Sequence, residues 1–367
     1  MAEEHIAPTA RLKSTTLNKY LKQAVEPIFR KSFLLGALKA YKRLRYNEGG
    51  LKLEWRPRFR RDTITAGRGT ATTITFPIMN VHKTATLPWR NYWMGCSIHE
   101  FEKLANKGES AWFNIVQGIV DQKIDDFMDD LRFKMYLDGN AAASNRDLHG
   151  LESWHSDDGT TVGTTGYVGN PNDTYAGQST ALGVSGTWSA PSGFGWPLGA
   201  TGEVEYCWWS PLNVDYGASF GGTANSWKLQ WQQAINFGVS YLEKLQGVRP
   251  DVCLLDSELL RQAQDSLISV QTFELTQRSK LTDAGFQTLA HNGVEFHSEM
   301  GVTADCGYLI PFSKLHLHSM QPQLVMTEKD HDITTLTDLI ALKAWIQLRA
   351  ESPAFFGKLR RITALGT

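Results

Sequence analysis

The segment IVQGIVDQKIDDFMDDLRFKMYLDGN, residues 115–140, predicts one long helix that limits the folds open to this chain. Its apolar residues recur every three or four positions and therefore lie on one stripe. The stripe consists of Val116, Val120, Ile124, Phe127, Leu131 and Met135. No proline interrupts the run, and Gly139 and Asn140 supply the left-handed conformations that end helices.

The helical pattern extends toward the N-terminus as far as Ser97, which could act as an N-cap with Glu100 three residues later. A helix or helix pair from residue 97 to residue 137 would be roughly 60 Å long at about 1.5 Å per residue. This length exceeds the diameter of a small globular domain. The sequence therefore predicts an extended protein in which this helix is a rigid beam.

Five aspartates follow one another along the same helix. They are Asp121, Asp125, Asp126, Asp129 and Asp130. Like charges at this spacing repel by about 0.2–0.5 kcal/mol per pair. Two interpretations stay open: a solvated helix face, or a surface that meets cations of another chain or of a distant part of this one. A metal site is a weaker candidate, because calcium loops take their ligands from a turn around glycine and not from a helix face.

Composition indicates a folded protein. The 367 residues suffice for two or more packed units, and 20% charged and 42% hydrophobic residues exclude a disordered chain. Apolar runs near the start, such as FLLGAL, are far shorter than the about 20 residues of a membrane span. The beginning MAEEHIAPTARLK lacks the order of a signal peptide, so we expect a cytoplasmic protein without processing signals. Cys96, Cys207, Cys253 and Cys306 match no zinc spacing and are expected to be buried thiols in a reducing compartment.

Charge is unevenly distributed, although the formal net charge is −1. Residues 1–70 contain 16 Lys and Arg against 6 Asp and Glu, and the remainder contains 21 against 32. The basic first 70 residues and the acidic remainder attract each other, within one chain or between copies. A basic N-terminal arm can also face nucleic acid. Two helices are expected here, one after Ser14 and one from Pro27 to Asn47. The second helix would carry four cations in its last turns, namely Lys39, Lys42, Arg43 and Arg45.

Residues 51–92 change to the alternation that is typical of strands. LKLEWRPRF alternates apolar and charged residues, and TTITFPIM is rich in β-branched residues. HKTATLPWRNYW could pair back on the first of these strands. An isolated two-stranded ribbon is marginal in water. We therefore expect the ribbon to lie on something else, and a neighbouring subunit is the obvious candidate.

The second half of the chain begins with a glycine-rich stretch and continues as α/β structure. Residues 139–203 contain 13 glycines, which predicts loop-rich β structure. Further on we expect a helix closed by Gly247, a strand in RPDVCLLD, a helix capped by Asp256 or Ser257, a hairpin at HNGV and strands in GYLIP and KLHLHSM. LIALKAWIQLRAE predicts a half-buried strand, with Lys343, Trp345, Gln347 and Arg349 on its outward side.

The order of these parts resembles the major capsid proteins of tailed bacteriophages. The resemblance covers nearly the whole chain, and its local patterns include DGN followed by HGLESW, and RPDVCLLD. It implies an α+β fold of the Hong Kong 97-like capsid type. The implied parts are an N-terminal arm (1–50), an extended β loop (51–92), a peripheral domain with a spine helix near 97–138 and a Gly/Trp-rich insertion (93–209), an α/β axial domain (210–325) and a return strand of the peripheral domain (326–367).

The resemblance also implies a function. It predicts a major capsid protein that self-assembles into an icosahedral shell around the double-stranded DNA genome of a phage, located in the virion and assembled in the host cytoplasm. The implied partners are copies of itself in hexamers and pentamers, and packaged DNA on the inner face. Scaffolding, portal and decoration proteins are further partners that it allows, and no membrane is implied. It implies no cofactor and no metal, and the chain is not expected to be an enzyme.

Two sets of charged residues are candidates for contacts in such a shell. Loop arginines are expected to meet acidic groups of a neighbouring subunit, and the helix aspartates at 121–130 are candidates for those groups. These arginines are Arg56, Arg58, Arg60, Arg61 and Arg68. The arm cations Lys39, Lys42, Arg43 and Arg45 are expected to face DNA.

Several other functions stay open as alternatives. Glu203 and Glu205 would share one face of a strand beside Trp208 and Trp209, an arrangement that suits glycoside hydrolysis. A metal site could use histidines at His316, His318, His291 and His297. The basic first 70 residues would also fit a dedicated DNA-binding protein, and an encapsulin-like nanocompartment shares the capsid fold. A phosphate-binding loop is not predicted, because the glycine-rich segment GRGT, residues 67–70, lacks the lysine that such a loop needs.

Overall fold

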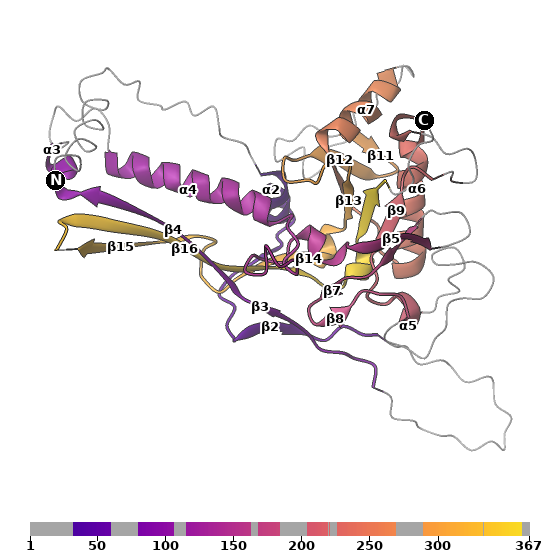
Figure 1. Cartoon of the computed structure of the whole chain (residues 1–367), viewed down its shortest axis with the longest axis horizontal. Coiled ribbons are helices and arrows are strands. Elements are labelled where there is room, and N and C mark those ends of the chain that lie inside the picture. Colours follow the sequence, from indigo (N-terminus) through magenta and orange to yellow (C-terminus); the bar gives the residue numbers. More distant parts are fainter. Residues whose placement is uncertain are drawn as a thin grey trace.

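The computed structural model describes residues 32–59, 80–105, 115–162, 168–183, 204–218, 220, 226–268, 289–332 and 334–361. A compact part lies at one end of the molecule, and a long helix beside a narrow ribbon of strands projects from it (Figure 1). Helices and sheets alternate irregularly along the chain, so the predicted α+β class is confirmed.

The ribbon is an antiparallel sheet around one long strand, β16 (Thr337–Ala350). Along its outer half, β16 lies between β4 (Arg90–His99) and β15 (Met326–Asp332). Near the compact part it pairs with β14 (Leu315–Ser319), which pairs in parallel with β1 (Leu44–Arg45). The predicted inward row of β16 is confirmed, because its side chains are buried: Leu342, Ala344, Ile346 and Leu348.

The helix α4 (Ile115–Lys134) lies against one face of this ribbon (Figure 1). Phe127, Leu131 and Met135 of the predicted stripe are buried and Ile124 is half-buried. The side chains of Val116 and Val120 lie outside the described part of the chain.

The predicted start of the long helix at Ser97 is wrong. Ser97 lies inside β4 and pairs with Leu339 of β16, and a separate short helix, α3 (Glu100–Ala105), follows it. The helical interpretation missed that Tyr92, Met94, Cys96 and Ile98 alternate with period two, and ten residues of pairing with β16 stabilise the strand. Residues 106–114 of the predicted spine lie outside the described residues.

The compact part is built on an eight-stranded sheet whose strand order is β11-β12-β10-β13-β17-β9-β6-β5. The strands are β5 (Asp157–Val162), β6 (Val168–Pro171), β9 (Leu212–Asp215), β10 (Val252–Leu255), β11 (Leu289–His291), β12 (Val294–Ser298), β13 (Gly307–Ile310) and β17 (Gly357–Arg360). Two helices pack on it, α6 (Trp227–Gln246) and α7 (Ser257–Ile268). Gly247 closes α6 with a φ of 63°, as predicted. Asn292 and Gly293 form the predicted hairpin turn with φ values of 51° and 71°.

The predicted domain boundaries do not follow these sheets. The boundaries assign β5 and β6 to the peripheral domain, but both strands lie in the eight-stranded sheet. The strand β17 was expected to return to the peripheral domain, but it lies in the same eight-stranded sheet. The strand β14, expected in the axial domain, joins the ribbon. The sheet that each strand joins depends on pairing between residues far apart in sequence, and local sequence patterns carry no information about that pairing.

Two further segments lie against these sheets. The helix α2 (Phe33–Ala40) is shorter than the predicted helix that ends at Asn47, because Lys42 has a φ of 56° and the chain then pairs with β14 as β1. The predicted helix after Ser14 lies outside the described residues. The strands β2 (Lys52–Trp55) and β3 (Ala85–Pro88) pair antiparallel, as expected for the two sides of the loop.

Short elements complete the connections. They are η2 (Leu151–Trp154), β7 (Thr174–Tyr175), β8 (Gln178–Ser179), α5 (Val204–Cys207), η3 (Phe312–Lys314) and η4 (Pro353–Phe355). Cys207, Cys253 and Cys306 are buried as predicted, and Cys96 is half-buried. Among the described residues, no helix combines the length and apolarity needed to cross a membrane.

Candidate subunit interfaces

The root of the extended loop, residues 51–59 and 80–88, packs on its own subunit. This corrects the expectation that the loop strands need a neighbouring subunit for support. Trp55 Nε1 donates a hydrogen bond of 2.9 Å to the Glu351 carbonyl. The Phe59 ring lies 5.9 Å from Trp208, and the Lys83 ammonium lies 5.1 Å and 5.4 Å from these two rings. Leu53, Phe59, Ala85 and Leu87 are buried. Segments of the same chain therefore supply the apolar support for residues 51–59 and 80–88.

Arg56 and Arg58 follow the outward side of this root. Both are exposed, while Leu53 and Phe59 on the same segment are buried. Both are therefore accessible to another molecule. Arg60, Arg61 and Arg68 lie outside the described residues.

The aspartates of α4 are only partly available to a neighbour. Asp129 lies 3.0 Å from the guanidinium of Arg132, and Asp126 lies 3.4 Å from the ammonium of Lys123. Asp121, Asp126 and Asp130 are exposed, whereas Asp125 and Asp129 are half-buried. Local cations thus neutralise part of the predicted acidic surface. This pairing was visible in the sequence, because Lys123 and Arg132 stand three residues from their partners.

The N-terminal arm is fastened at two points. At the first, the buried Glu299 carboxylate accepts hydrogen bonds from Ser32 Oγ and the Leu34 amide, both at 3.0 Å, and from the Tyr136 hydroxyl at 2.7 Å. Burial raises the pKa of Glu299. At the second, Glu48 Oε2 lies 2.6 Å from His318 Nδ1 next to the β1–β14 pairing. These contacts tie the arm to the end of α4, to β12 and to the ribbon.

The arm cations lie between these two points. Lys39 stands in the last turn of α2, and Lys42, Arg43 and Arg45 follow the helix instead of lying within it. Lys39, Lys42 and Arg45 are exposed and Arg43 is half-buried. Three of the four are therefore accessible to a polyanion.

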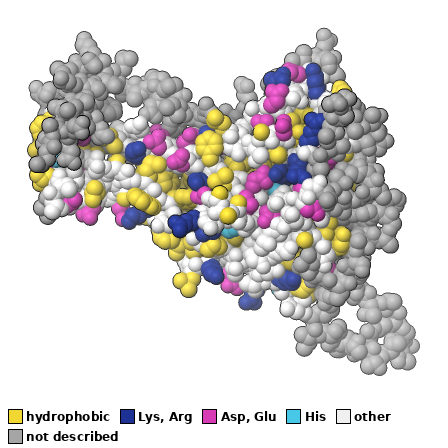
Figure 2. Space-filling view, in the orientation of Figure 1, with side chains coloured by type: hydrophobic (Ala, Val, Ile, Leu, Met, Phe, Trp, Pro, Cys, Tyr) yellow, Lys and Arg dark blue, Asp and Glu magenta, His cyan; other side chains and the backbone are white. Residues whose placement is uncertain are grey.

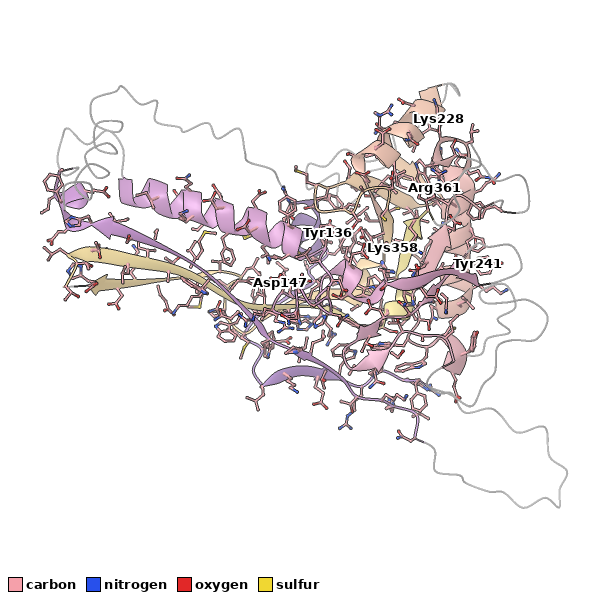
Figure 3. All side chains as sticks on the ribbon, viewed as in Figure 1. Tyr136, Asp147, Lys228, Tyr241, Lys358 and Arg361 are labelled. Atoms are coloured by element: carbon pink, nitrogen blue, oxygen red, sulfur yellow. The ribbon has the colours of Figure 1, made fainter. Side chains whose placement is uncertain are left out.

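An ion pair between the buried Lys358 and the half-buried Glu152 joins η2 to the eight-stranded sheet. Lys358 Nζ lies 2.7 Å from both carboxylate oxygens of Glu152, which also accepts hydrogen bonds from the Tyr308 and Thr303 hydroxyls. Burial favours the neutral form of Glu152, but the charge and hydrogen bonds of Lys358 prevail and hold its pKa below the usual range. Figure 3 shows Lys358 inside the compact part and Tyr136 at the end of α4.

The strand expected for the predicted glycoside-hydrolysing carboxylates is not formed at Glu205. Glu205 is buried in α5, a helix and not a strand, and Glu203 lies outside the described residues. Trp208 and Trp209 are buried as well, in an aromatic cluster with Trp55 and Tyr175. These tryptophans therefore present no surface on which a sugar could stack.

A cavity of about 340 Å³ lies where α4, α7 and the end of β12 meet. It is lined by Arg132, Asp256, Ser257, Ser298, Glu299, Met300 and Val302. Glu299 belongs to the contacts that fasten α2 to the end of α4, and Arg132 pairs with Asp129 within α4. The cavity is therefore a gap at a structural junction.

The histidines that a metal site would use take part in ring packing and in contacts with carboxylates. His297 stacks on Phe33 at 3.9 Å, and His291 meets the edge of Trp231 at 5.1 Å. His316 Nε2 lies 3.6 Å from Glu351, and His318 contacts Glu48. Within the described ranges, no three His, Cys, Asp or Glu residues are arranged so that they could hold a metal ion.

The buried histidines predict that acid destabilises the subunit. Burial lowers the pKa of His155 to about 3 and those of His149 and His297 to about 4. Imidazole in an unfolded chain titrates near 6.5, so the unfolded state binds more protons as the pH falls from 6.5 toward 4. At about 1.4 kcal/mol per pKa unit, the summed loss over this window is several kcal/mol. Thermal unfolding of unassembled subunits at pH 7 to 4 measures it.

Buried carboxyls act in the opposite direction, and a variant isolates the histidine effect. Burial raises the pKa of Asp173 to about 6, which favours the folded state as the pH falls from 6 toward 3.8. Burial also raises the pKa values of Asp138 and Glu299. We expect the histidines to outweigh these carboxyls, because burial lowers the pKa of five described histidines. Replacing His297 by phenylalanine should flatten the pH dependence, whereas the exposed His331→Gln change should not. An unfolding temperature that is constant between pH 6.5 and 4 would contradict the prediction.

The structure reveals one surface that the sequence interpretation did not single out. On the ribbon, Trp93 is 72% exposed, Trp345 is 38% exposed, and Leu339 is exposed as well. Figure 2 shows hydrophobic side chains along the ribbon and at its end. The position of Trp345 among Lys343, Gln347 and Arg349 was the available signal, because a tryptophan on the outward side of a half-buried strand is unusual.

The comparisons with known proteins are consistent with this architecture. No family model matches the chain, and no curated protein does. Solved structures do match. The cyanophage A-1(L) capsid protein is 17% identical over 95% of this chain and 97% of its own, with a TM-score of 0.58. A chain of the capsid of a native GTA particle is 10% identical over 94% and 95%, with a TM-score of 0.55. The capsid protein of the Myoviridae phage XM1 is 11% identical over 94% and 97%, with a TM-score of 0.53.

These matches span nearly the whole length of both chains, so the chain has the capsid fold of the tailed-phage major capsid proteins. The Hong Kong 97-like fold class expected from the sequence is confirmed. The SrpI encapsulin of Synechococcus elongatus is also similar, with 8% identity over 97% of both chains and a TM-score of 0.52.

Proposed function

We propose that this chain is a major capsid protein that self-assembles into an icosahedral shell around the double-stranded DNA genome of a phage. One observation carries the proposal: the similarity to phage capsid proteins extends over 95% of this chain and includes the projecting ribbon, the long helix and the compact sheet. The role is structural, and we propose no enzymatic activity.

The shape of the subunit supports this role. Copies in a closed shell touch one another through several different surfaces, which an elongated subunit provides more readily than a sphere. The ribbon and α4 stiffen each other through the buried row of β16, so the projection keeps its direction. The partners in this proposal are other copies, arranged in hexamers and pentamers. DNA on the inner face would meet Lys39, Lys42 and Arg45. Scaffolding, portal and decoration proteins could join the shell, which would form in the host cytoplasm.

The charged loop is proposed to contact a neighbouring subunit. Arg56 and Arg58 are exposed on the loop root, and the chain continues with Arg60, Arg61 and Arg68. The aspartates at 121–130 of a neighbour are one acceptor for these cations, although Asp126 and Asp129 already have partners within α4. Exposed ion pairs contribute only about 0–1 kcal/mol each. The charges would therefore adjust how neighbouring subunits align, while apolar burial supplies most of the free energy of their association.

Charge reversal at Arg58, Arg60 and Arg61 should abolish particle formation and leave a folded subunit. Three glutamates would place like charges against an acidic neighbour, and the Arg58 side chain is exposed on the described part of the loop. We expect at least a ten-fold loss of particles by electron microscopy and an unchanged circular dichroism spectrum. The matched variant with lysine at all three positions should assemble. Normal particles from the glutamate variant would argue against this contact.

Negative-stain microscopy of the chain expressed alone tests the function itself. The proposal expects closed particles of uniform size. A population restricted to monomers and small oligomers, over a range of concentration and salt, would refute self-assembly without accessory proteins. Co-expression with candidate accessory proteins would then decide whether the chain forms a shell at all.

An encapsulin-like compartment is the second candidate, favoured by the similarity to the SrpI encapsulin over 97% of both chains. The two functions differ in what the shell encloses. Nuclease-resistant DNA in particles from the native source favours the phage shell, whereas an enclosed enzyme favours the compartment. We place the phage shell first because of the basic N-terminal region and the Gly/Trp-rich insertion.

A further inference from the structure

Polar groups from three segments meet just beyond the end of α4, where the helix reaches the compact part (Figure 1). Asp138, Gly139 and Asn140 follow α4, Ser153 lies in η2, and Asp173 stands directly before β7. The Gly139 amide donates a hydrogen bond of 2.9 Å to Ser153 Oγ. Asn140 Nδ2 donates to the Ser153 carbonyl at 2.8 Å and to Asp173 Oδ1 at 3.1 Å. One amide side chain therefore joins the end of α4 to η2 and to the segment before β7.

Oxygen atoms of several kinds surround Asn140. Besides the Ser153 carbonyl and Asp173 Oδ1, Asp138 Oδ1 accepts a hydrogen bond of 2.8 Å from the Asn140 main-chain amide. The Asn140 side chain carries an oxygen of its own. Two carboxylates, one main-chain carbonyl and one side-chain amide thus lie together. Oxygens of these kinds are the ligands that calcium takes in proteins.

The Asp173 carboxylate is the group in this cluster that its own chain leaves unbalanced. The residue is only 9% exposed. Its Oδ1 accepts hydrogen bonds from Asn140 and from the Thr174 amide at 2.7 Å, whereas Oδ2 is buried and has no hydrogen-bond partner. The Ser156 amide favours the ionised carboxyl from nearby, but it makes no hydrogen bond of good geometry to Oδ2. A buried carboxylate oxygen costs free energy unless a donor or a cation reaches it.

The charges around this carboxylate are negative. Among the described residues, no lysine or arginine forms an ion pair with Asp138 or Asp173. Burial raises the pKa of Asp173 to about 6, and the charge of Asp138 adds to this rise. Burial raises the pKa of Asp138 as well. A divalent cation beside both carboxylates would oppose these effects, because it favours their ionised forms.

We propose that Asp138 and Asp173, together with the Asn140 side-chain oxygen and the Ser153 carbonyl, bind a calcium ion. The Asn140 amide would turn so that its oxygen faces the ion in place of its nitrogen. The set has two carboxylates and no histidine or cysteine, so it differs from the groups of three that the described residues do not form. The ion would tie together the end of α4, η2 and the segment before β7 in every subunit, whatever the shell encloses.

The ligand set also indicates affinity and selectivity. Only two ligands are charged and Asn140 is exposed, which fits a weak site with a dissociation constant on the order of 0.1–1 mM. Magnesium is disfavoured, because it requires a nearly ideal octahedron and gives up its water reluctantly. Calcium accepts the irregular geometry of loop oxygens.

Thermal unfolding of unassembled full-length subunits, first treated with EDTA, tests the site. Roughly 10 mM CaCl₂ should shift the folding equilibrium by a factor of about 10–100 and raise the unfolding temperature by about 2–3 °C. The same concentration of MgCl₂ should produce a clearly smaller rise. Asp173→Asn and Asp138→Asn should each abolish the calcium-dependent rise, and Asp130→Asn, on the exposed side of α4, should keep it. Without calcium, Asp173→Asn should unfold at no lower temperature than the unaltered chain, because the amide removes a buried charge.

Terbium luminescence excited through tryptophan gives a second measurement. Trp154 follows Ser153, and its ring lies 4.9 Å from that of Tyr175, two residues after Asp173. We expect the unaltered chain to sensitise bound terbium(III), calcium to displace it, and Asp173→Asn to lose the signal. A calcium response that persists in Asp173→Asn, or an equal response to magnesium, would overturn the proposal. The absence of any calcium effect on unfolding and luminescence would overturn it as well, and would leave the proposed shell function untouched.

Discussion

Replacing Lys358 by methionine should lower the free energy of unfolding of the subunit by about 3–5 kcal/mol. The change leaves the half-buried Glu152 carboxylate without the cation that lies 2.7 Å from both of its oxygens. The hydrogen bonds from Tyr308 and Thr303 remain, but they do not compensate a buried charge. Urea unfolding of unassembled subunits, followed by circular dichroism, measures the loss.

Two controls separate the buried charge from a general effect of losing a lysine. Replacing Glu152 by leucine together with Lys358→Met removes both charges and should recover at least half of the lost stability. Lys343→Met removes a cation whose partner Glu328 is exposed, and should cost less than about 1 kcal/mol. Equal losses for Lys358→Met and Lys343→Met would show that the Glu152 site is more hydrated than its burial indicates.

The position of this ion pair explains why it matters for a shell subunit. Glu152 lies in η2, just after the segment that follows α4, and Lys358 lies in β17 of the eight-stranded sheet. The pair, together with Glu299 and Tyr136, therefore fixes the direction in which α4 and the ribbon leave the compact part. A weakened junction should broaden the range of subunit shapes, and we expect irregular particles before complete failure of assembly.

Elements set by local chemistry could be predicted from the sequence. The hairpin at Asn292 and Gly293, the closure of α6 at Gly247 and the alternation of β16 all follow from residues next to one another. The resemblance to capsid proteins added the global arrangement, which the structure comparisons support over the whole chain. Local pattern and global fold agree at these positions.

Pairings between distant segments could not be predicted in this way. Only the end of β4, from Ser97 onward, was taken for helix, because Ser97 and Glu100 fit a cap. The partner of β4 in β16 stands more than 200 residues later. The Glu152–Lys358 pair joins residues separated by 206 positions, and no spacing rule connects them. The same limit affects the interface candidates: the sequence identified the loop arginines, but Trp93 had no visible role until β4 placed it beside Trp345.

Replacing Trp154 by alanine should destabilise the subunit by about 3–5 kcal/mol. Trp154 is fully buried, with its ring 4.9 Å from Tyr175 and 5.4 Å from Phe356. These neighbours belong to the core that also supports Trp209 and the loop root, so they cannot collapse into the space without moving β2. Urea unfolding of unassembled subunits is again the measurement, because assembly would stabilise the folded state by mass action.

The same change at an exposed tryptophan should leave the stability of the subunit nearly unchanged and reduce particle formation. Trp345→Ala removes the same ring from a side chain that is 38% exposed, and we expect unfolding to change by less than about 1 kcal/mol. If the exposed ribbon surface around Trp345 contacts another copy in the shell, this variant should nevertheless form at least ten-fold fewer particles. Trp154→Phe, which refills most of the cavity, should lose clearly less stability than Trp154→Ala. Equal unfolding losses for the alanine variants at 154 and 345 would mean that the two tryptophans do not divide into core and contact surface.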